Sequence, residues 1–240
     1  MFLALDIGNS RLKAALYNKM EQVASWNYAK DEAENFVLRV QDCFSDFPSL
    51  KAMGVSSGER PKGLPERIQW LDVESNWPIR IDYSSPKSLG VDRLLAASAA
   101  FLEYGPNVLA VTAGTCITYN VVVAGEFKGG AISPGLNMRF QAMHSFTVAL
   151  PNVESDPAAA LLGTDTISNL QAGVNVALPL EVESMIARYC EEFNLEKVVI
   201  CGGDRNALRN PLKKHIFAPS NYELHALKQL HEYFKNQGLS

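Results

Sequence analysis

The sequence lacks the features that define several large classes of protein. None of its apolar runs approaches the roughly 18 residues that a membrane-spanning helix requires. It has only four cysteines, and they form no CxxC pair, so neither a disulfide framework nor a zinc site is expected. They are Cys43, Cys116, Cys190 and Cys201. These absences favour a protein that folds in water around an apolar core.

Excess positive charge is also absent. Lys and Arg number 22 against 26 Asp and Glu, which gives a net charge of -4, and no basic run could neutralise a phosphate backbone. The opening segment has no basic residues, and Asp6 interrupts its apolar stretch, so it does not read as a secretion signal. We therefore expect a cytoplasmic protein with neither a nucleic-acid nor a membrane partner.

The two best-known nucleotide-binding motifs are missing, since the chain has no GxxxxGK[ST] loop and no GxGxxG turn after a strand. Two other glycine turns each follow an apolar run: Gly8-Asn9-Ser10 and Ala113-Gly114-Thr115. Glycine lets backbone amides approach a phosphate, and Asp6 at a strand end could hold Mg²⁺. Each turn predicts a phosphate site, and an ordinary hairpin turn is the alternative.

Short apolar runs alternate with helical patterns, which is typical of an α/β protein. Strands are predicted at Leu3–Ile7, Arg11–Tyr17, Gln22–Trp26, Ala52–Ser56, Ile79–Asp82, Val108–Thr112, Cys116–Val123 and Lys197–Cys201. Helices are predicted at 31–44, Asp92–Tyr104, Thr166–Ala177, Leu180–Phe193 and Tyr222–Phe234, with a break at Pro179. Gly105-Pro106 ends a helix, and the second half repeats the opening pattern. This predicts two domains, residues 1–106 and 107–240, with a cleft between them.

Two further segments have a functional and a structural interpretation. In Gly90-Val91-Asp92-Arg93, Asp92 either caps the following helix or orients and deprotonates a substrate hydroxyl, with Arg93 pairing to a substrate carboxylate. Gly202-Gly203-Asp204 follows a buried strand and is either a place of close approach for adenine or a plain turn.

Five motifs in order resemble those of the type III pantothenate kinases, a family of the acetate and sugar kinase and actin-like ATPase fold group. The matching segments are Asp6-Ile7-Gly8-Asn9-Ser10, Tyr83 and Pro86 before Gly90-Val91-Asp92-Arg93, Ala113-Gly114-Thr115, the run from Gly129 to Gly135, and Gly163 through Thr166 to Gly173. They span most of the chain.

The resemblance implies two ribonuclease-H-like domains, each a mixed sheet with helices. It also implies ATP-dependent phosphorylation of pantothenate to 4'-phosphopantothenate, the first step of coenzyme A biosynthesis, with Mg²⁺ as cofactor and a homodimer as the assembly. The alternatives are a non-catalytic regulatory or binding homologue and a kinase of another small hydroxyl compound. The presence of Asp6, Asp92, Arg93 and Thr115 favours catalysis.

Matching the motifs also implies a role for individual residues. Asp92 would be the general base on the pantothenate hydroxyl, and Asp6 would hold Mg²⁺. The implied ATP-binding residues are Asp6, Ile7, Gly8, Asn9, Ser10, Arg11, Leu12, Lys13 and Thr115. The implied pantothenate-binding residues are Tyr83, Gly90, Val91, Asp92, Arg93 and Thr166, the last from its own or the partner subunit. Thr112 stands where the family usually has an Asp associated with K⁺ or NH₄⁺, which weakens the case for that cation site.

Overall fold

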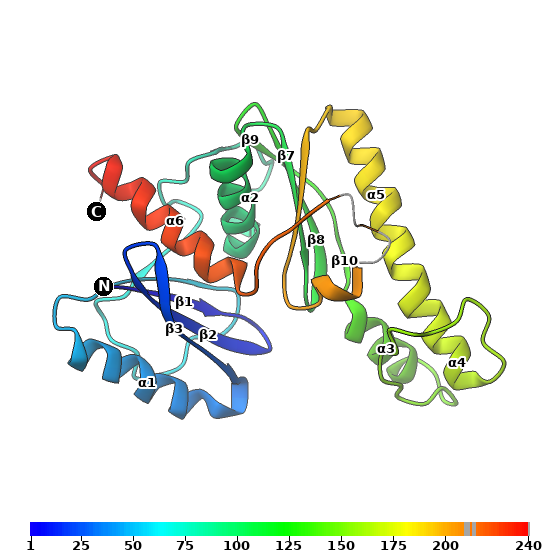
Figure 1. Cartoon of the computed structure of the whole chain (residues 1–240). Coiled ribbons are helices and arrows are strands. Elements are labelled where there is room, and N and C mark those ends of the chain that lie inside the picture. Colours follow the sequence, from blue (N-terminus) through cyan, green and yellow to red (C-terminus); the bar gives the residue numbers. More distant parts are fainter. Residues whose placement is uncertain (209–211, 213–214, 240) are drawn as a thin grey trace. The chain divides into compact units, whose positions relative to one another are not determined.

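The computed structural model describes residues 1–208, 212 and 215–239 (Figure 1). The chain forms two compact units, one made of Met1–Glu103 with Asn221–Ser240 and the other of Tyr104–Ser220. Each unit contains a mixed β-sheet and helices, so the predicted α/β class is confirmed. None of the helices within the described residues has the length and apolar character that crossing a membrane requires.

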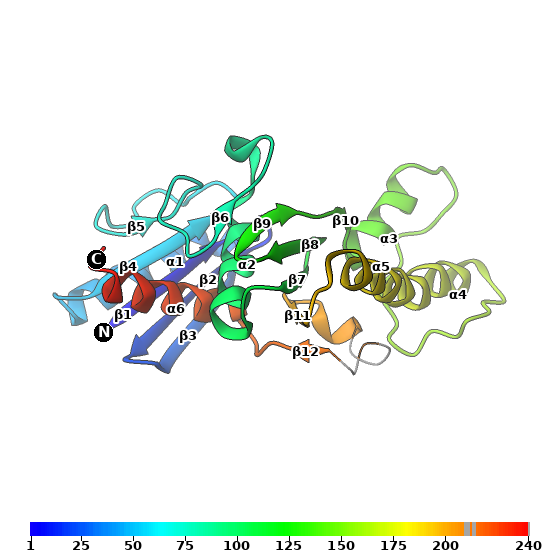
Figure 2. The ribbon, with the colours of Figure 1, turned by 90° about the horizontal axis from the view of Figure 1, so that it is seen from above.

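The sheet of the first unit has the strand order β3-β2-β1-β4-β5 (Figure 2). Its strands are β1 (Phe2–Ile7), β2 (Arg11–Asn18), β3 (Glu21–Ala29), β4 (Lys51–Ser56) and β5 (Gln69–Trp70). The first three form an antiparallel meander, because tight turns join them, whereas β4 returns parallel to β1. The parallel pair places the ends of β1 and β4 at one edge of the sheet.

Two helices cover opposite faces of this sheet, α1 (Ala33–Asp46) and α6 (Tyr222–Asn236) (Figure 1). Leu3 and Leu5 of β1 pack in one core with Phe36 of α1. Side chains alternate along a strand, so Phe2 and Asp6 project from the other face, which α6 covers. Asp6 is therefore carried on the α6 side of the sheet.

The remaining elements of the first unit are β6 (Arg80–Ile81), a 3₁₀ turn η2 (Pro86–Ser88) and α2 (Val91–Tyr104). A short 3₁₀ turn, η1 (Lys30–Glu32), lies just before α1. The predicted strand 79–82 shrinks to two residues, and the edge beside β4 is taken by β5 instead. A two-residue strand is too short to show the alternation from which strands are predicted.

The sheet of the second unit follows the same plan. The strands that this unit contributes follow the order β12-β11-β7-β8-β9, with β10 paired to β8. The strands are β7 (Val108–Ala113), β8 (Cys116–Val123), β9 (Glu126–Gly129), β10 (Ile132–Pro134), β11 (Lys197–Cys201) and β12 (Ile216–Phe217). As in the first unit, a strand pairs antiparallel with its successor and parallel with a later strand. The repeat suggested by two short motifs therefore extends over both sheets.

The helices of the second unit are α3 (Leu136–Ser145), α4 (Thr166–Gln171), α5 (Ala177–Phe193) and two short turns, η3 (Ala172–Val176) and η4 (Arg205–Leu208). The predicted break at Pro179 is wrong, because α5 continues through this residue. Pro179 lies in the first turn of α5, directly after the π-helical turn η3. Proline is tolerated there because the hydrogen-bond pattern is already changing and fewer donors are needed.

The compact units differ from the predicted domains in one element. The sequence placed residues 221–240 in the second domain, whereas α6 packs on β1 and belongs with the first unit. Leu224, Leu227 and Leu230 of α6 are fully buried. Such spacing predicts an amphipathic helix but carries no information about which sheet the helix covers.

Candidate functional site

The first glycine turn joins β1 to β2 and is held by backbone hydrogen bonds. The Gly8 amide donates to the Arg11 carbonyl at 3.0 Å. The amides of Ser57 and Gly58, which follow β4, donate to the Ile7 carbonyl at 3.0 and 3.2 Å. A Cβ atom on Gly58 would lie 2.8 Å from the Gly8 carbonyl oxygen, so the loop after β4 directly supports the turn. Sequence reasoning did not single out this supporting loop.

The predicted ATP-binding residues of this turn differ in exposure. Asn9, Ser10 and Arg11 are exposed and can reach a phosphate. The side chains of Ile7 and Leu12 are fully buried in the core, so only their backbone atoms could contact a nucleotide. A cavity of about 380 Å³ adjoins Asn9. Its lining includes three cations and one acid, namely Lys30, Arg60, Lys62 and Glu59. This local excess of positive charge suits a polyphosphate.

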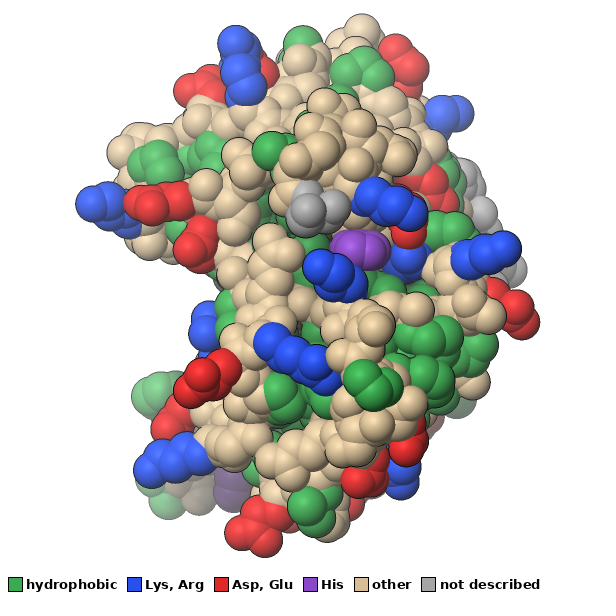
Figure 3. Space-filling model, turned by 90° about the vertical axis from the view of Figure 1, so that its left-hand side faces the viewer, with side chains coloured by type: hydrophobic (Ala, Val, Ile, Leu, Met, Phe, Trp, Pro, Cys, Tyr) green, Lys and Arg blue, Asp and Glu red, His purple; other side chains and the backbone are tan. Residues whose placement is uncertain are grey.

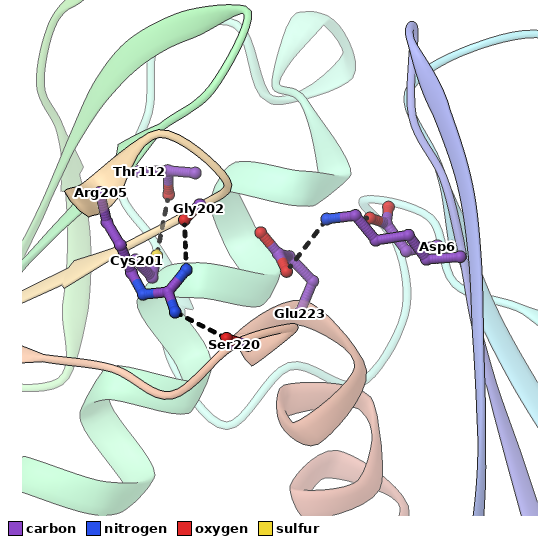
Figure 4. A network of polar contacts seen from close by, with 8 residues as sticks. Asp6, Thr112, Cys201, Gly202, Arg205, Ser220 and Glu223 are labelled. Carbon is purple, nitrogen blue, oxygen red and sulfur yellow. Dashed lines mark hydrogen bonds and ion pairs between the residues drawn. The ribbon is translucent and has the colours of Figure 1, made fainter. Parts of the chain in front are cut away.

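Asp6 lies among charged groups from three other elements. Lys13 Nζ is 3.9 Å from Asp6 Oδ2 and 3.6 Å from Glu223 Oε2, at the start of α6 (Figure 4). Burial and the nearby charges of Glu223 and Asp92 together raise the pKa of Asp6 to about 7, although Lys13 acts in the opposite direction. A divalent cation would relieve this excess of negative charge, so the donor set fits Mg²⁺. Glu223 lies far from Asp6 in the sequence, and no motif marked it.

Few protein ligands are available for such a cation. The described residues contain no group of three or more His, Cys, Asp or Glu side chains that could hold a metal ion. Mg²⁺ commonly binds one or two carboxylates together with substrate phosphates and water. Asp6 with the phosphates of a nucleotide would supply that arrangement.

Asp92 is not the cap of α2. The Gly90 carbonyl accepts from the amides of Arg93 and Leu94 at 3.1 and 3.4 Å, which makes Gly90 the capping position. The capping interpretation of Asp92 is therefore wrong, because its carboxylate lies inside the first turn and is exposed. A Cβ atom on Gly90 would approach Asp92 Oδ1 to 2.5 Å. Glycine thus leaves room for the carboxylate to fold back over the helix start.

The other residues predicted to bind pantothenate in the first unit lie close to Asp92 in the chain. Tyr83 and Val91 are partly exposed. Arg93 is 6% exposed, so most of its side chain is shielded from solvent. Their contacts with pantothenate stay predictions.

The second glycine turn, in the other unit, is built in the same way. The Gly114 amide donates to the Cys116 carbonyl at 3.1 Å, and the Asp204 amide, after β11, donates to the Ala113 carbonyl at 3.0 Å. The Gly135 amide donates to the Thr115 carbonyl at 3.0 Å. Thr115, the predicted phosphate contact, is exposed. Three separate glycine motifs therefore meet at this turn.

Two of these glycines leave no room for a side chain. A Cβ atom on Gly135 would lie 2.0 Å from the Gly114 carbonyl oxygen. A Cβ atom on Gly202 would lie 2.2 Å from the Ala113 carbonyl oxygen. Arg205 braces the second of them by donating to the Gly202 carbonyl at 3.0 Å and to Ser220 Oγ at 2.8 Å (Figure 4). The segment beginning at Gly202 thus supports the turn, and its contact with adenine stays a prediction.

We expect Gly135→Ala to weaken ATP binding, because the new methyl group must displace the Gly114 carbonyl. A shift of about 1 Å in a positioning element can cost on the order of 10²-fold in rate. The matched control is Gly173→Ala, since no atom lies within 4 Å of its added Cβ. The KM for ATP and the melting temperature of both variants are the measurements. Equal KM values in Gly135→Ala and Gly173→Ala would contradict this role for Gly135.

Thr112 does not offer the charge that a monovalent cation site requires. Its Oγ1 lies 3.3 Å from Cys201 Sγ, at the end of the neighbouring strand β11 (Figure 4). Neither residue supplies a carboxylate. The contact fills the space beside Thr112 with a thiol, so these two residues do not fit a potassium ion.

Thr166 is the first residue of α4 and is exposed. Asp165 caps this helix by accepting from the Ser168 amide at 2.9 Å, and that hydrogen bond lowers the pKa of Asp165. Large apolar side chains nearby in the chain are also exposed, namely Phe146, Val148, Leu161, Leu162 and Ile167. Thr166 thus stands within an exposed apolar segment of the second unit.

The duplicated sheet with a glycine turn after each first strand is the plan of the actin-like ATPase-fold kinases. A ROK family glucokinase from Streptomyces griseus, solved with glucose and AMPPNP, aligns with a TM-score of 0.54 at 12% identity, over 95% of this chain and 98% of that one. A Campylobacter jejuni protein assigned to the Baf family of transcriptional activators aligns with a TM-score of 0.64 at 19% identity, over 98% of each chain. At these identities the likeness establishes the fold.

Sequence comparison identifies the family within this fold. The profile of the type III pantothenate kinases matches residues 62–188. The type III pantothenate kinase of Christiangramia forsetii is 34% identical over 99% of this chain and 100% of its own length. That of Flavobacterium johnsoniae is 31% identical over 97% of this chain and 98% of its own. The chain belongs to the type III pantothenate kinase family, whose members phosphorylate pantothenate in coenzyme A biosynthesis.

Proposed function

We propose that the two glycine turns hold the phosphates of ATP and that Asp92 accepts the proton of the pantothenate hydroxyl. The observation that carries this proposal is a cluster of three carboxylates with one cation. The buried carboxylate of Asp6 lies near those of Asp92 and Glu223, and Lys13 is the cation beside it. A kinase needs an excess of negative charge at the place where its carboxylates hold the divalent cation that accompanies the phosphates. Mg²⁺, when bound, would neutralise charge that develops on the transferred phosphoryl group.

The chemical step needs one proton acceptor and two positioned reactants. Asp92 removes the hydroxyl proton as the hydroxyl oxygen forms a bond to the γ-phosphorus. The bond between that phosphorus and the oxygen bridging to the β-phosphate breaks, and ADP leaves with the electron pair. Amides and side chains of the first turn, above all Asn9 and Ser10, hold the phosphates in line.

A coupled assay of ADP release tests this function directly. We expect ADP release that requires both Mg²⁺ and pantothenate and that saturates with each. ADP release that needs a different small alcohol would favour a kinase of another substrate. Binding of pantothenate without any turnover would favour the non-catalytic homologue. ATP is the expected donor, and its supply places the reaction in the cytoplasm.

The second unit also supports a homodimer. Leu161 and Leu162 are each 80% exposed and Phe146 is 88% exposed, which is unusual for large apolar side chains in a monomer. A second copy of the chain would cover this segment. Because Thr166 lies beside it, Thr166 would then approach pantothenate from the partner subunit.

We expect the double variant Leu161→Asp, Leu162→Asp to sediment as a monomer, whereas the unmodified protein sediments as a dimer. Burying two carboxylates without partners in an apolar interface costs several kcal/mol. Leu38→Asp is the control, because Leu38 on α1 is 58% exposed and lies in the other unit. An unchanged dimer in the double variant would show that this segment is not the interface.

We expect activity that is largely independent of potassium and ammonium. A monovalent cation held by few ligands depends on a formal negative charge, which Thr112 does not provide. Pantothenate-dependent ADP release in sodium, potassium and Tris buffers of equal ionic strength measures this. Strong activation by potassium would contradict the expectation. Potassium activation gained by Thr112→Asp would confirm the position as the cation ligand.

A further inference from the structure

A cavity of about 360 Å³ opens at the end of the first unit's sheet that is opposite to Asp6. Phe2 at the start of β1, Lys51 at the start of β4 and His231 on α6 contribute to its lining. Phe2 and Asp6 are four residues apart on one strand, which separates them by about 13 Å at roughly 3.3 Å per residue. None of the predicted ATP-binding or pantothenate-binding residues lines this cavity.

The charge of the lining has one sign. Lys51 and Arg67 line the cavity, and its described lining residues include no Asp or Glu. Ser49, Gln69 and His231 add uncharged polar groups. Figure 3 shows Lys and Arg side chains beside a histidine on one face of the molecule, with an acidic side chain next to them. A concave site with two cations and no acid attracts an anion.

Arg67 is held in place before any ligand arrives. Its Nη1 donates to the Pro48 carbonyl at 2.8 Å and its Nη2 donates to the Phe44 carbonyl at 3.2 Å. The guanidinium also lies 4.2 Å from the centre of the Phe44 ring. Guanidinium has five N–H donors in a fixed plane, and these two bonds use two of them. A fixed guanidinium loses little entropy when it binds a carboxylate or phosphate.

Another part of the lining is aromatic. The rings of Phe2 and His231 stack with their centroids 4.3 Å apart and their planes 16° apart. Burial lowers the pKa of His231, and Lys228, Lys235 and Lys51 lower it further against the opposing effect of Glu232. Lys228 itself pairs with Glu232. The imidazole therefore offers a neutral ring with one donor and one acceptor beside the cations.

We propose that this cavity binds a small organic anion, with its phosphate or carboxylate group at Lys51 and Arg67 and its apolar part beside Phe2 and His231. The site is separate from the one that binds ATP and pantothenate. A phosphate and a carboxylate can each pair with the side chains of Lys51 and Arg67. The volume of the cavity accommodates a molecule larger than a single ion.

The test uses the histidine resonances of the whole protein, because the chain has only four histidines. The Hε1 signal of His231, assigned by its loss in His231→Asn, is followed during titration with phenyl phosphate and, separately, with benzoate, each to about 20 mM. We expect a saturable shift of His231 with at least one probe. The probe that binds more tightly identifies the headgroup.

Two variants and one internal reporter decide the location. We expect Lys51→Gln and Arg67→Lys each to raise the dissociation constant about tenfold, whereas Lys62→Gln leaves it unchanged. Lys62 belongs to the other cavity, beside Asn9. His225, two residues after Glu223 near the start of α6, reports on binding at that end of the helix. No saturable shift of His231, equal affinity in Lys51→Gln, or displacement of the probe by ATP would overturn the proposal.

Discussion

Asp92→Asn is expected to lower kcat by roughly 10²- to 10⁴-fold, the usual contribution of a general base. The amide has the size of the carboxylate but cannot accept the hydroxyl proton. Asp92 is exposed in the first turn of α2 and is not the helix cap, so no hydrogen bond that starts the helix is lost. The KM for ATP is expected to stay within a few-fold of the original value.

Stability is the control for this variant. Removing a negative charge from the first turn of a helix costs roughly 0.3–1 kcal/mol through the helix dipole. Glu34→Gln removes a charge from the first turn of α1, so both variants should lose a similar and small amount of melting temperature. Only Asp92→Asn should lose turnover. Turnover near the original value in folded Asp92→Asn would assign the proton acceptor to another group.

Asp6→Asn is expected to move activity and stability in opposite directions. Asn has no formal charge for Mg²⁺, and transition-state charge stabilisation by a metal is worth several kcal/mol, so we expect a loss on the order of 10²- to 10³-fold in kcat/KM. The dependence of activity on Mg²⁺ concentration should shift to higher concentration. An unchanged Mg²⁺ dependence would remove Asp6 from the metal site.

The stability of the same variant is measured without metal, in EDTA. The Asp6 carboxyl has an ordinary pKa of 3.8 when unfolded and about 7 when folded, so between these values the folded protein binds more protons. The free energy of unfolding contributed by this group is therefore present below pH 4 and is lost as pH rises through 7. The Asp6→Asn variant does not lose this stability, because its amide does not ionise. We expect it to be about 2–4 kcal/mol more stable than the original protein at pH 8 and nearly equal at pH 4.

Urea unfolding at both pH values measures this difference. The Lys13→Met variant is a useful comparison, because it removes the cation that favours the Asp6 carboxylate and should lower stability at pH 8. A variant Asp6→Asn less stable than the original protein at pH 8 would contradict the raised pKa. Activity lost together with stability gained would show that the carboxylate is kept for chemistry.

The local elements could be predicted from the sequence because their signals are local. The apolar runs of β1 and β7, the alternation in β2 and the glycine turns predict strands that end within one or two residues of those observed. Family resemblance added the activity, which no single turn could have supplied. Long-range contacts could not be predicted: Glu223 pairs with Lys13, and Gly58 supports the first turn, from segments that no motif marks.

Pro179 shows a different reason for failure. A proline normally marks a helix boundary, and the π-helical turn that accommodates it has no recognised sequence signature. The sequence supports two interpretations of Asp92, a helix cap and a proton acceptor, because Asp is common in both roles. One carbonyl settles the point, since the hydrogen bonds of Gly90 define where α2 begins.

The discontinuous first unit has a consequence for how the chain is made. Its sheet is complete once β5 leaves the ribosome, but the helix that covers one face, α6, is synthesised only after the whole second unit. At roughly 5–20 residues per second, that interval is on the order of ten seconds. During it, Phe2 and its neighbours on that face have no cover from α6. The nascent protein therefore presents an apolar surface to chaperones until α6 has been synthesised.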